Sequence, residues 1–256
     1  MSFLSEIIER KRQRLESARR IVPIESFETR RGSHRFRQAL LRDRINIIAE
    51  FKRRSPSKGV IRAEADIKQF VSSYEAGGAA AISVLTEEDY FSGSLDDLRL
   101  VKETVDLPVL RKDFIVDEYQ IYESAAAGAD AVLLIVAALD DQNLLSLRKL
   151  IEDELGMDAL VEVHTREEMQ RAVKCRASVI GVNNRNLHTF EVSLDTSLSL
   201  AAEAPAGTVL ISESGLNTAG DLARLRDAGY RGFLIGETLM RSENPEAALR
   251  DLVSNP

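Results

Sequence analysis

The sequence contains a single cysteine, Cys175, so no disulfide bond can form within one chain. A reducing, cytoplasmic location is therefore the expectation. No apolar run approaches the ~20 residues that a helix needs to cross a bilayer. The N-terminal segment is too charged for a signal peptide, and Glu6, Glu9 and Glu16 argue against a transit peptide. These absences predict a cytoplasmic protein with no membrane association.

Several motifs that mark common cofactor sites are missing. No G-x-G-x-x-G follows the first predicted strand, and the sequence has neither a Walker loop nor a G-x-S-x-G motif. The three histidines, His34, His164 and His188, are not spaced as metal ligands. His164 is instead expected to be a loop residue after the fifth strand, and no metal site is predicted.

Positive charge is scarce over most of the chain but not at its start. The 256 residues carry a formal net charge of −7, yet residues 1–44 hold 12 Lys and Arg against 6 Asp and Glu. Such an arm could bind nucleic acid, but the acidic remainder would repel phosphate backbones. Phe3, Leu4, Ile7 and Ile8 recur at helical spacing, which predicts an amphipathic helix with a solvated face. No nucleic-acid partner is expected.

From residue 45 onward, short apolar runs alternate with longer charged segments that have helical periodicity. The runs are apolar on both faces, as parallel strands that lie between other layers must be. The predicted strands are Ile45–Lys52, Ala80–Thr86, Pro108–Lys112, Ala131–Ile135, Ala159–Val163, Val179–Asn183, Thr208–Ser212 and Gly232–Gly236.

Helix start and stop signals lie between these runs. Thr165 with Glu168 is predicted to form a capping box, and Thr218 with Asp221 a weaker version of it. Helices are predicted to end in left-handed glycines at Gly77, Gly128 and Gly229.

The same glycines mark a weak internal repeat, seen in EAGGAAAISV, AAGADAVLLI and DAGYRGFLIG. Their spacing corresponds to about 25 residues per unit, enough for one strand, one helix and two short loops. Eight consecutive units without a break in composition predict a single (β/α)8 TIM barrel over residues 1–256. A doubly wound open sheet is the alternative, and the missing glycine motif disfavours it.

Polar residues lie at the ends of several predicted strands. Glu50 and Lys52 share the face of Ile48, so the lower layers of a barrel would be apolar and its top layer charged. The chemistry of such a barrel takes place at the carboxyl ends of its strands. The pattern recurs at four more strand ends, with Lys112, Glu162, the group Asn183, Asn184 and Arg185, and the group Glu213, Ser214 and Gly215.

One charged residue near a strand end is adequately explained by contact with water. Five strand ends that converge on one mouth are not, because buried ions are costly unless they are paired or used. Desolvation and neighbouring carboxylates shift the pKa of a lysine in opposite directions. Lys52 and Lys112 are therefore candidates for a general acid or a Schiff-base nucleophile, and the sequence leaves that choice open.

Two further loops fit a phosphate site. In barrels, the loops after strands seven and eight often bind phosphate through backbone N–H groups, and here they read SESG and IGETLMRS. Gly215 and Gly236 would let the backbone come close, and a short helix from Glu237 could present its N-terminus. Ser55 and Ser57, in the basic first loop, could add hydrogen-bond donors.

Taken together, these residues resemble the indole-3-glycerol-phosphate synthase family of tryptophan biosynthesis, nearly from end to end. The likeness is carried by IIAEFKRRSPSKG, ISVLTEEDYFSGS, LPVLRKDFIVDEYQI, GADAVLLIV, VEVHT, IGVNNRNL, ISESG and FLIGETLMR. Phosphoribosylanthranilate isomerase and the tryptophan synthase α subunit, two other phosphate-binding barrels, do not carry the first and third of these segments together.

The resemblance implies a cytoplasmic carboxy-lyase that acts on 1-(2-carboxyphenylamino)-1-deoxyribulose 5-phosphate. This enzyme closes the pyrrole ring with loss of CO2 and water, and it uses no metal or organic cofactor. Residues 1–44 would form a helical extension that caps the barrel mouth. A monomer is favoured, and no fused second barrel is expected.

The resemblance also implies roles for the strand-end residues. Lys112 would protonate the ketone during ring closure, and Lys52 would contact the substrate carboxylate and act in dehydration, although the division of steps between the lysines stays open. Glu162 would be the general base or stabilise a cationic intermediate, and Glu50 would orient the lysines. The other implied residues are Asn183, Glu213 and Ser214 for positioning, Ser55, Gly215, Gly236 and Glu237 for phosphate, Phe91, Phe114 and Leu133 around the anthranilate ring, and Arg185 as support.

Two other functions remain as alternatives. A related barrel could isomerise a phosphorylated sugar, or a catalytically inactive barrel could act as a binding module. Glu50, Lys52, Lys112 and Glu162 are all present, which argues against an inactive barrel.

Overall fold

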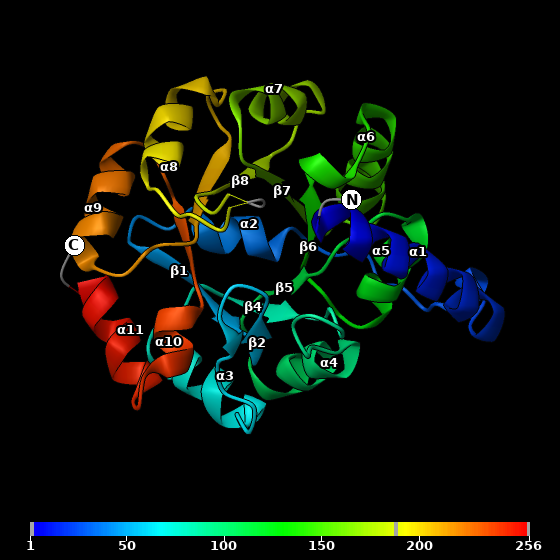
Figure 1. Ribbon diagram of the computed structural model, residues 1–256, viewed down its shortest axis with the longest axis horizontal. Coiled ribbons are helices and arrows are strands. Elements are labelled where there is room, and N and C mark those ends of the chain that lie inside the picture. The colour runs from blue at the N-terminus through cyan, green and yellow to red at the C-terminus, as the bar shows by residue number, and fades with distance from the viewer. Residues whose placement is uncertain (1–2, 187–188, 255–256) are drawn as a thin grey trace.

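Eight parallel strands close into a barrel in the computed structural model, which describes residues 3–186 and 189–254. Around the ring the strands follow the order β1-β10-β9-β8-β7-β6-β5-β4, and helices surround them (Figure 1). The predicted TIM barrel is confirmed, and the open sheet is wrong. The barrel strands are β1 (Asn46–Phe51), β4 (Ala81–Leu85), β5 (Val109–Lys112), β6 (Ala131–Ile135), β7 (Asp158–Val163), β8 (Val179–Asn183), β9 (Val209–Glu213) and β10 (Gly232–Ile235).

Helices connect successive strands on the outside of the ring. Within the described residues, none of them combines the length and apolar composition needed to cross a membrane. The connecting helices are α3 (Ile67–Ala76), α4 (Leu95–Thr104), α5 (Glu118–Ala126), α6 (Asp141–Lys149), α7 (Arg166–Lys174), α8 (Asp195–Leu200) and α9 (Ala219–Asp227), and the last strand is followed by α10 (Glu237–Arg241) and α11 (Pro245–Ser254). Shorter elements are η1 (Ile24–Ser26), η2 (Val136–Ala138), η3 (Leu150–Glu154), η4 (Ala201–Glu203) and the hairpin strands β2 (Arg54–Ser55) and β3 (Gly59–Val60).

Two apolar layers follow from the alternation of side chains along the strands. Ile48 packs inside the barrel with Leu110 and Leu160. Its neighbours Ile47 and Ala49 pack outward, in the layer between strands and helices. This is the alternation predicted for the first strand, and each such large side chain contributes about 1.5–3 kcal/mol when it is fully buried.

The predicted glycine caps are correct at two of three places. Gly128 and Gly229 adopt the left-handed conformation, with φ of 87° and 102°. The prediction at Gly77 is wrong, because the next residue, Gly78, has φ of 91° while Gly77 has −73°. Gly77 is needed for space instead, since a Cβ there would lie 3.0 Å from the carbonyl oxygen of Glu246 in α11.

Of the two predicted capping boxes, only the one that was predicted to be weaker forms completely. Thr165 Oγ1 accepts the backbone N–H of Glu168 at 3.2 Å, which is half of a box. The Glu168 carboxylate, however, accepts the N–H of His164 rather than that of Thr165. Thr218 and Asp221, the pair predicted to be weaker, form the complete box at the start of α9.

The N-terminal extension is divided between the two ends of the barrel. Helix α1 (Phe3–Ile21) lies along the rim of the mouth, whereas α2 (Arg35–Leu40) crosses the barrel (Figure 1). Phe36 and Leu40 of α2 pack into the interior layer, and Leu40 lies next to Gly232, the first residue of β10. The resemblance implied that all of residues 1–44 cap the mouth. Helix α2 instead closes the opposite end of the barrel, where its apolar side chains fill the space between the first residues of the strands.

Ion pairs hold α1 on the loops that follow β4 and β5. Lys11 is only 6% exposed, and its Nζ lies 2.8 Å from Asp113 Oδ1 and 3.2 Å from Glu88 Oε2. Burial alone would raise the pKa of Asp113, but Lys11 and Arg111 hold it well below its usual range. Arg14 also pairs with Glu88, at 2.6 Å. Part of the positive charge of the extension is thus used within the molecule, which supports a docked amphipathic helix over a nucleic-acid-binding arm.

Replacing Lys11 by alanine is expected to lower the free energy of unfolding by about 3 kcal/mol, because breaking a buried pair leaves a charge without its partner. Chemical denaturation of the variant and the wild type measures this loss. Arg12→Ala, at an exposed position of the same helix, is the control and should change stability by less than about 0.5 kcal/mol. An equally small change for Lys11→Ala would show that the remaining partners satisfy Asp113.

Candidate active site

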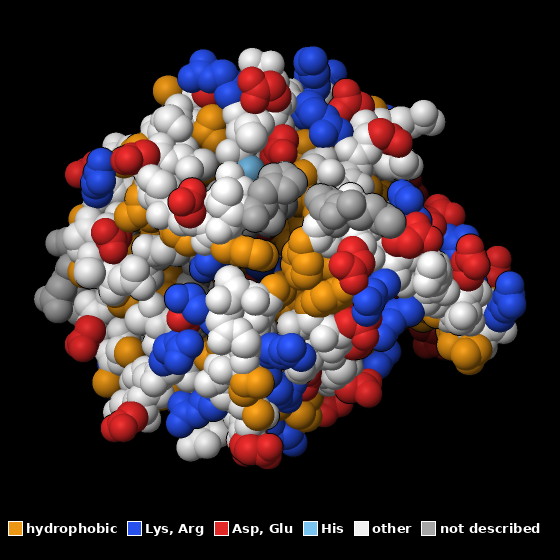
Figure 2. Space-filling model, in the orientation of Figure 1, with side chains coloured by type: hydrophobic (Ala, Val, Ile, Leu, Met, Phe, Trp, Pro, Cys, Tyr) orange, Lys and Arg blue, Asp and Glu red, His pale blue; other side chains and the backbone are white. Residues whose placement is uncertain are grey.

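A cavity of about 700 Å³ opens at the carboxyl ends of the barrel strands. Figure 2 looks onto this opening, and Lys and Arg side chains gather on the part of the face below it. Every residue that the sequence assigned to a site lines this one cavity. These residues are Glu50, Lys52, Ser55, Ser57, Phe91, Lys112, Phe114, Leu133, Glu162, Asn183, Arg185, Glu213, Ser214, Gly215, Gly236 and Glu237.

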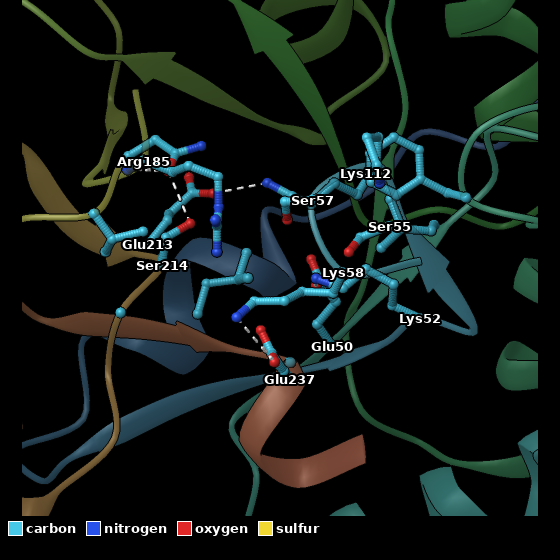
Figure 3. Close-up of a pocket in the computed structure, with 18 of the residues that line it drawn as sticks. Glu50, Lys52, Ser55, Ser57, Lys58, Lys112, Arg185, Glu213, Ser214 and Glu237 are labelled. Atoms are coloured by element: carbon cyan, nitrogen blue, oxygen red, sulfur yellow. Dashed lines mark hydrogen bonds and ion pairs between the residues drawn. The ribbon is translucent and has the colours of Figure 1, made fainter. Parts of the chain in front are cut away.

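Lys112, the last residue of β5, lies at the centre of the charged cluster in the cavity. Its Nζ is 2.7 Å from Glu213 Oε2 of β9 and 3.2 Å from Glu162 Oε2 of β7. Two strands away around the ring, Lys52 pairs with Glu50 of β1. Figure 3 labels Lys112, Glu213, Glu50 and Lys52 of this cluster among the residues that line the cavity. The two glutamates that face Lys112 are almost fully buried, so the interactions operate with little screening by water.

The cluster shifts the pKa values of its own members. Burial alone would lower the pKa of Lys112, but Glu213, Glu162 and Glu50 raise it well above its usual range. Burial raises the pKa of Glu213 to about 7, with Lys112 opposing the shift and Glu162 adding to it. Lys112 is therefore a protonated donor at neutral pH rather than a free amine, which favours a general acid over a Schiff-base nucleophile.

A hydrogen-bonded group at the ends of β8 and β9 fixes one side of the rim. Ser214 Oγ donates to Asn183 Oδ1 at 2.9 Å, and the backbone N–H of Arg185 donates to the same oxygen at 3.0 Å. Arg185 also donates to the carbonyl of Phe190 at 3.2 Å, which holds the following loop. Asn184 does not line the cavity, because neighbouring side chains alternate. It is buried, and its Nδ2 donates to the carbonyl of Ser214 at 3.1 Å and to Ser212 Oγ at 3.0 Å, so it supports the rim from behind.

Aromatic rings line the cavity beside α1. Phe91 and Phe114 have ring centroids 6.3 Å apart, and Leu133 forms the adjacent wall. Sequence reasoning missed Phe3 of α1 and Phe190 of the loop after β8, whose rings lie 6.1 Å apart and also line the cavity. Neither residue is close to a predicted strand end, so the alternation pattern gave no signal for them.

The opposite end of the cavity combines serines, glycines and two further cations. Glu237, an awkward neighbour for an anion, has its Oε1 3.7 Å from Lys58 Nζ and 3.1 Å from Arg241 Nε. Both cations line the cavity, and only Lys58, in the Ser-Pro-Ser-Lys loop, carried a sequence signal. Gly236 has a second function, because a Cβ there would collide with the side chain of Glu50.

Sequence reasoning also missed Gly181 of β8, which lies directly against the Glu213 side chain of the charged cluster. A Cβ at this position would overlap Glu213 Oε1 and lie 3.0 Å from Leu160 Cδ1. The glycine therefore makes room for a buried carboxylate. A glycine inside a strand of alternating apolar residues was the available signal.

Gly181→Ala is expected to displace Glu213 and lower kcat/KM by about 10²-fold, since small misplacements of a reacting group cost that much. Product formation by the variant at saturating and limiting substrate measures the loss. Gly220→Ala is the matched control, because its new Cβ would meet nothing closer than 3.8 Å. If Gly181→Ala kept the wild-type rate, the position of Glu213 would not matter for turnover.

No arrangement of three or more His, Cys, Asp or Glu side chains that could hold a metal ion occurs within residues 3–186 and 189–254. His34 and His164 each contact carboxylates instead. His188 lies outside the described residues.

A closed (β/α)8 barrel with buried lysine–glutamate pairs at its mouth defines an enzyme of the TIM-barrel class with an acid–base site. A family model described as indole-3-glycerol phosphate synthase matches residues 4–252. A relative of that name from Carboxydothermus hydrogenoformans is 46% identical over 98% of this chain and 100% of its own. Another from Laribacter hongkongensis is 47% identical over 98% of both chains. The chain belongs to the indole-3-glycerol phosphate synthase family, whose members are carboxy-lyases of tryptophan biosynthesis.

Two solved structures with a similar fold are much more distant in sequence. KGPDC from Streptococcus mutans aligns with a TM-score of 0.60 and 14% identity, over 82% of this chain and 96% of that one. Thiamine phosphate pyrophosphorylase from Pyrococcus furiosus aligns with a TM-score of 0.59 and 16% identity, over 81% and 93%. These likenesses concern the fold alone.

Proposed function

We propose that the cavity binds 1-(2-carboxyphenylamino)-1-deoxyribulose 5-phosphate and converts it into indole-3-glycerol phosphate, with loss of CO2 and water. The observation that carries this proposal is the position of Lys112 Nζ between the carboxylates of Glu162 and Glu213. An ammonium group held by two carboxylates in a water-poor cavity is a positioned proton donor.

The reaction divides into two stages that both require proton transfer. Lys112 donates a proton to the ketone oxygen as the aromatic carbon attacks the carbonyl carbon, and the carboxylate leaves as CO2 while its bonding electrons restore the benzene ring. Lys52 then donates a proton to the departing hydroxyl, which leaves as water. Glu162 takes the proton whose loss completes the pyrrole ring. Glu50, which pairs with Lys52, orients that lysine.

The two ends of the substrate match the two ends of the cavity. Its anthranilate ring lies against Phe91, Phe114 and Leu133. Its phosphate lies at the opposite end, and the residues proposed to hold it are Ser55, Ser57, Gly215, Gly236 and the backbone of Glu237. Lys58 and Arg241 add positive charge there, which an otherwise acidic protein needs in order to bind an anion.

An assay with the purified protein tests this function. Addition of the carboxyphenylamino substrate is expected to give a steady increase in indole fluorescence, together with one CO2 per product molecule. Absence of both signals would contradict the proposal. Isomerisation of a phosphorylated sugar in their place would favour the alternative barrel function instead.

We further propose that the enzyme acts as a monomer and without nucleic acid. Large exposed hydrophobic side chains among the described residues are few and belong to different elements of the chain. They are Ile21, Val22, Leu41, Val60, Phe190 and Val192, and the last two line the cavity. Light scattering tests whether the enzyme is a monomer. Salt-sensitive retention on heparin would contradict the statement that it acts without nucleic acid.

A further inference from the structure

His164, which directly follows β7, contacts the proposed general base from behind the cavity. Its Nε2 lies 3.4 Å from Glu162 Oε1, whereas Lys112 Nζ lies 3.2 Å from the other oxygen, Oε2. The His164 side chain is 10% exposed and does not line the cavity. The two oxygens of Glu162 therefore face two nitrogen groups, one inside the cavity and one behind it.

Glu168, in the first turn of α7, holds the opposite edge of the same imidazole ring. Its Oε2 accepts the backbone N–H of His164 at 2.7 Å and lies 3.1 Å from Nδ1. This contact is the reason that Glu168 does not complete a capping box with Thr165. The ring thus lies between two carboxylates, with Nδ1 hydrogen-bonded to Glu168 and Nε2 facing Glu162 at ion-pair distance without a hydrogen bond. Both nitrogens present a proton to the carboxylates only when the imidazole is protonated.

The charges around the ring favour that protonated form. Burial alone would lower the pKa of His164, but Glu168 of α7, Glu162 of β7 and Glu213 of β9 raise it above its ordinary value. Lys112 of β5 faces Glu162 from the other side. Burial likewise would raise the pKa of Glu162, but Lys112 and His164 lower it. A cation at His164 therefore stabilises the ionised carboxylate that a general base requires.

We propose that His164 is a positioning residue whose imidazolium, anchored by Glu168, orients Glu162 and holds positive charge against its Oε1. The inference rests on the proposed role of Glu162 as the base, and His164 acts only through that carboxylate. When His164 loses its proton, one ring nitrogen becomes an acceptor that faces a carboxylate, and the orientation of Glu162 is lost.

Titration of the imidazole signals by NMR on the full chain tests the charge directly. The His164 signal, assigned by its absence in His164→Gln, is expected to titrate above the ordinary value of about 6.5. Glu168→Gln and Glu162→Gln should each lower this pKa, because each removes a neighbouring negative charge. His34→Gln is the matched control, since His34 pairs with Asp158 at 3.0 Å at the other end of the barrel and should leave His164 unchanged. Titration at or below the ordinary value, or no response to either glutamine variant, would overturn the proposal.

The dependence of kcat/KM on pH tests the positioning. We expect the basic limb of the profile to coincide with the His164 titration and to move to lower pH in Glu168→Gln. His164→Phe should lose about tenfold in kcat with little change in KM, the size typical of a lost orienting partner, and His164→Gln should recover part of it. A wild-type rate and profile for His164→Phe would contradict the inference. Because the NMR titration needs no substrate, failure of the proposed reaction would leave that result intact.

Discussion

Lys112→Ala is expected to lower kcat by about 10²- to 10⁴-fold, the range typical of a lost general acid. Lys112 is the group that lies between Glu162 and Glu213, and its ammonium is the proton donor proposed for ring closure. Indole fluorescence at saturating substrate measures the loss. Far-ultraviolet circular dichroism is expected to show a folded barrel, because the residue lies at a strand end rather than in either apolar layer.

Lys102→Ala provides the matched control for this variant. Lys102 is also a half-buried lysine paired with a carboxylate, with its Nζ 2.7 Å from Asp130 Oδ2, but it lies on α4 and outside the cavity. Its replacement should leave kcat unchanged. A near-wild-type rate for Lys112→Ala, in a protein that still folds, would remove Lys112 from the mechanism.

Glu162→Gln is expected to lower kcat/KM by about 10²- to 10³-fold, because the amide keeps the volume of the side chain but cannot accept the proton. The change should also lower the pKa of Glu213, since Glu162 contributes to the value of about 7 and Lys112 would then face a single carboxylate. A profile of kcat/KM against pH measures both effects.

Glu203→Gln is the control for the loss of a glutamate charge. Glu203 lies on η4, and its Oε1 is 2.8 Å from Arg166 Nη1, away from the cavity. It should keep the wild-type rate and profile. If Glu162→Gln behaved in the same way, another group would have to be the base.

The features that the sequence predicted are those set by local periodicity. Alternation of side chains places Glu50 above Ile48 on the inner face of β1. The sequence grouped Asn184 with Asn183 at the mouth, and this part of the prediction is wrong, because Asn183 lines the cavity and Asn184 does not. Carboxyl ends of parallel strands meet at one mouth, so Lys112 and Glu162 could be brought together without coordinates. The strand bounds were correct for the same reason, to within one residue at each end.

The features that the sequence did not predict depend on contacts between segments that are far apart in the chain. The capping box at Thr165 fails because His164, directed by its contact with Glu162, competes for the Glu168 carboxylate. The use of Gly181 becomes visible only when Glu213 of the neighbouring strand is placed against it. Phe190 lines the cavity next to the antiparallel bridge between Arg185 and Val192, and no pattern in the sequence specifies that pairing.

A structure with product bound tests the account most directly. We predict that the indole ring lies against Phe91 and Phe114, that the phosphate lies against Ser55 and Gly215, and that Lys112 faces the ring. A product held elsewhere, or a ring that faces away from Lys112 and Glu162, would contradict the claim that side chains from separate strand ends form one catalytic site.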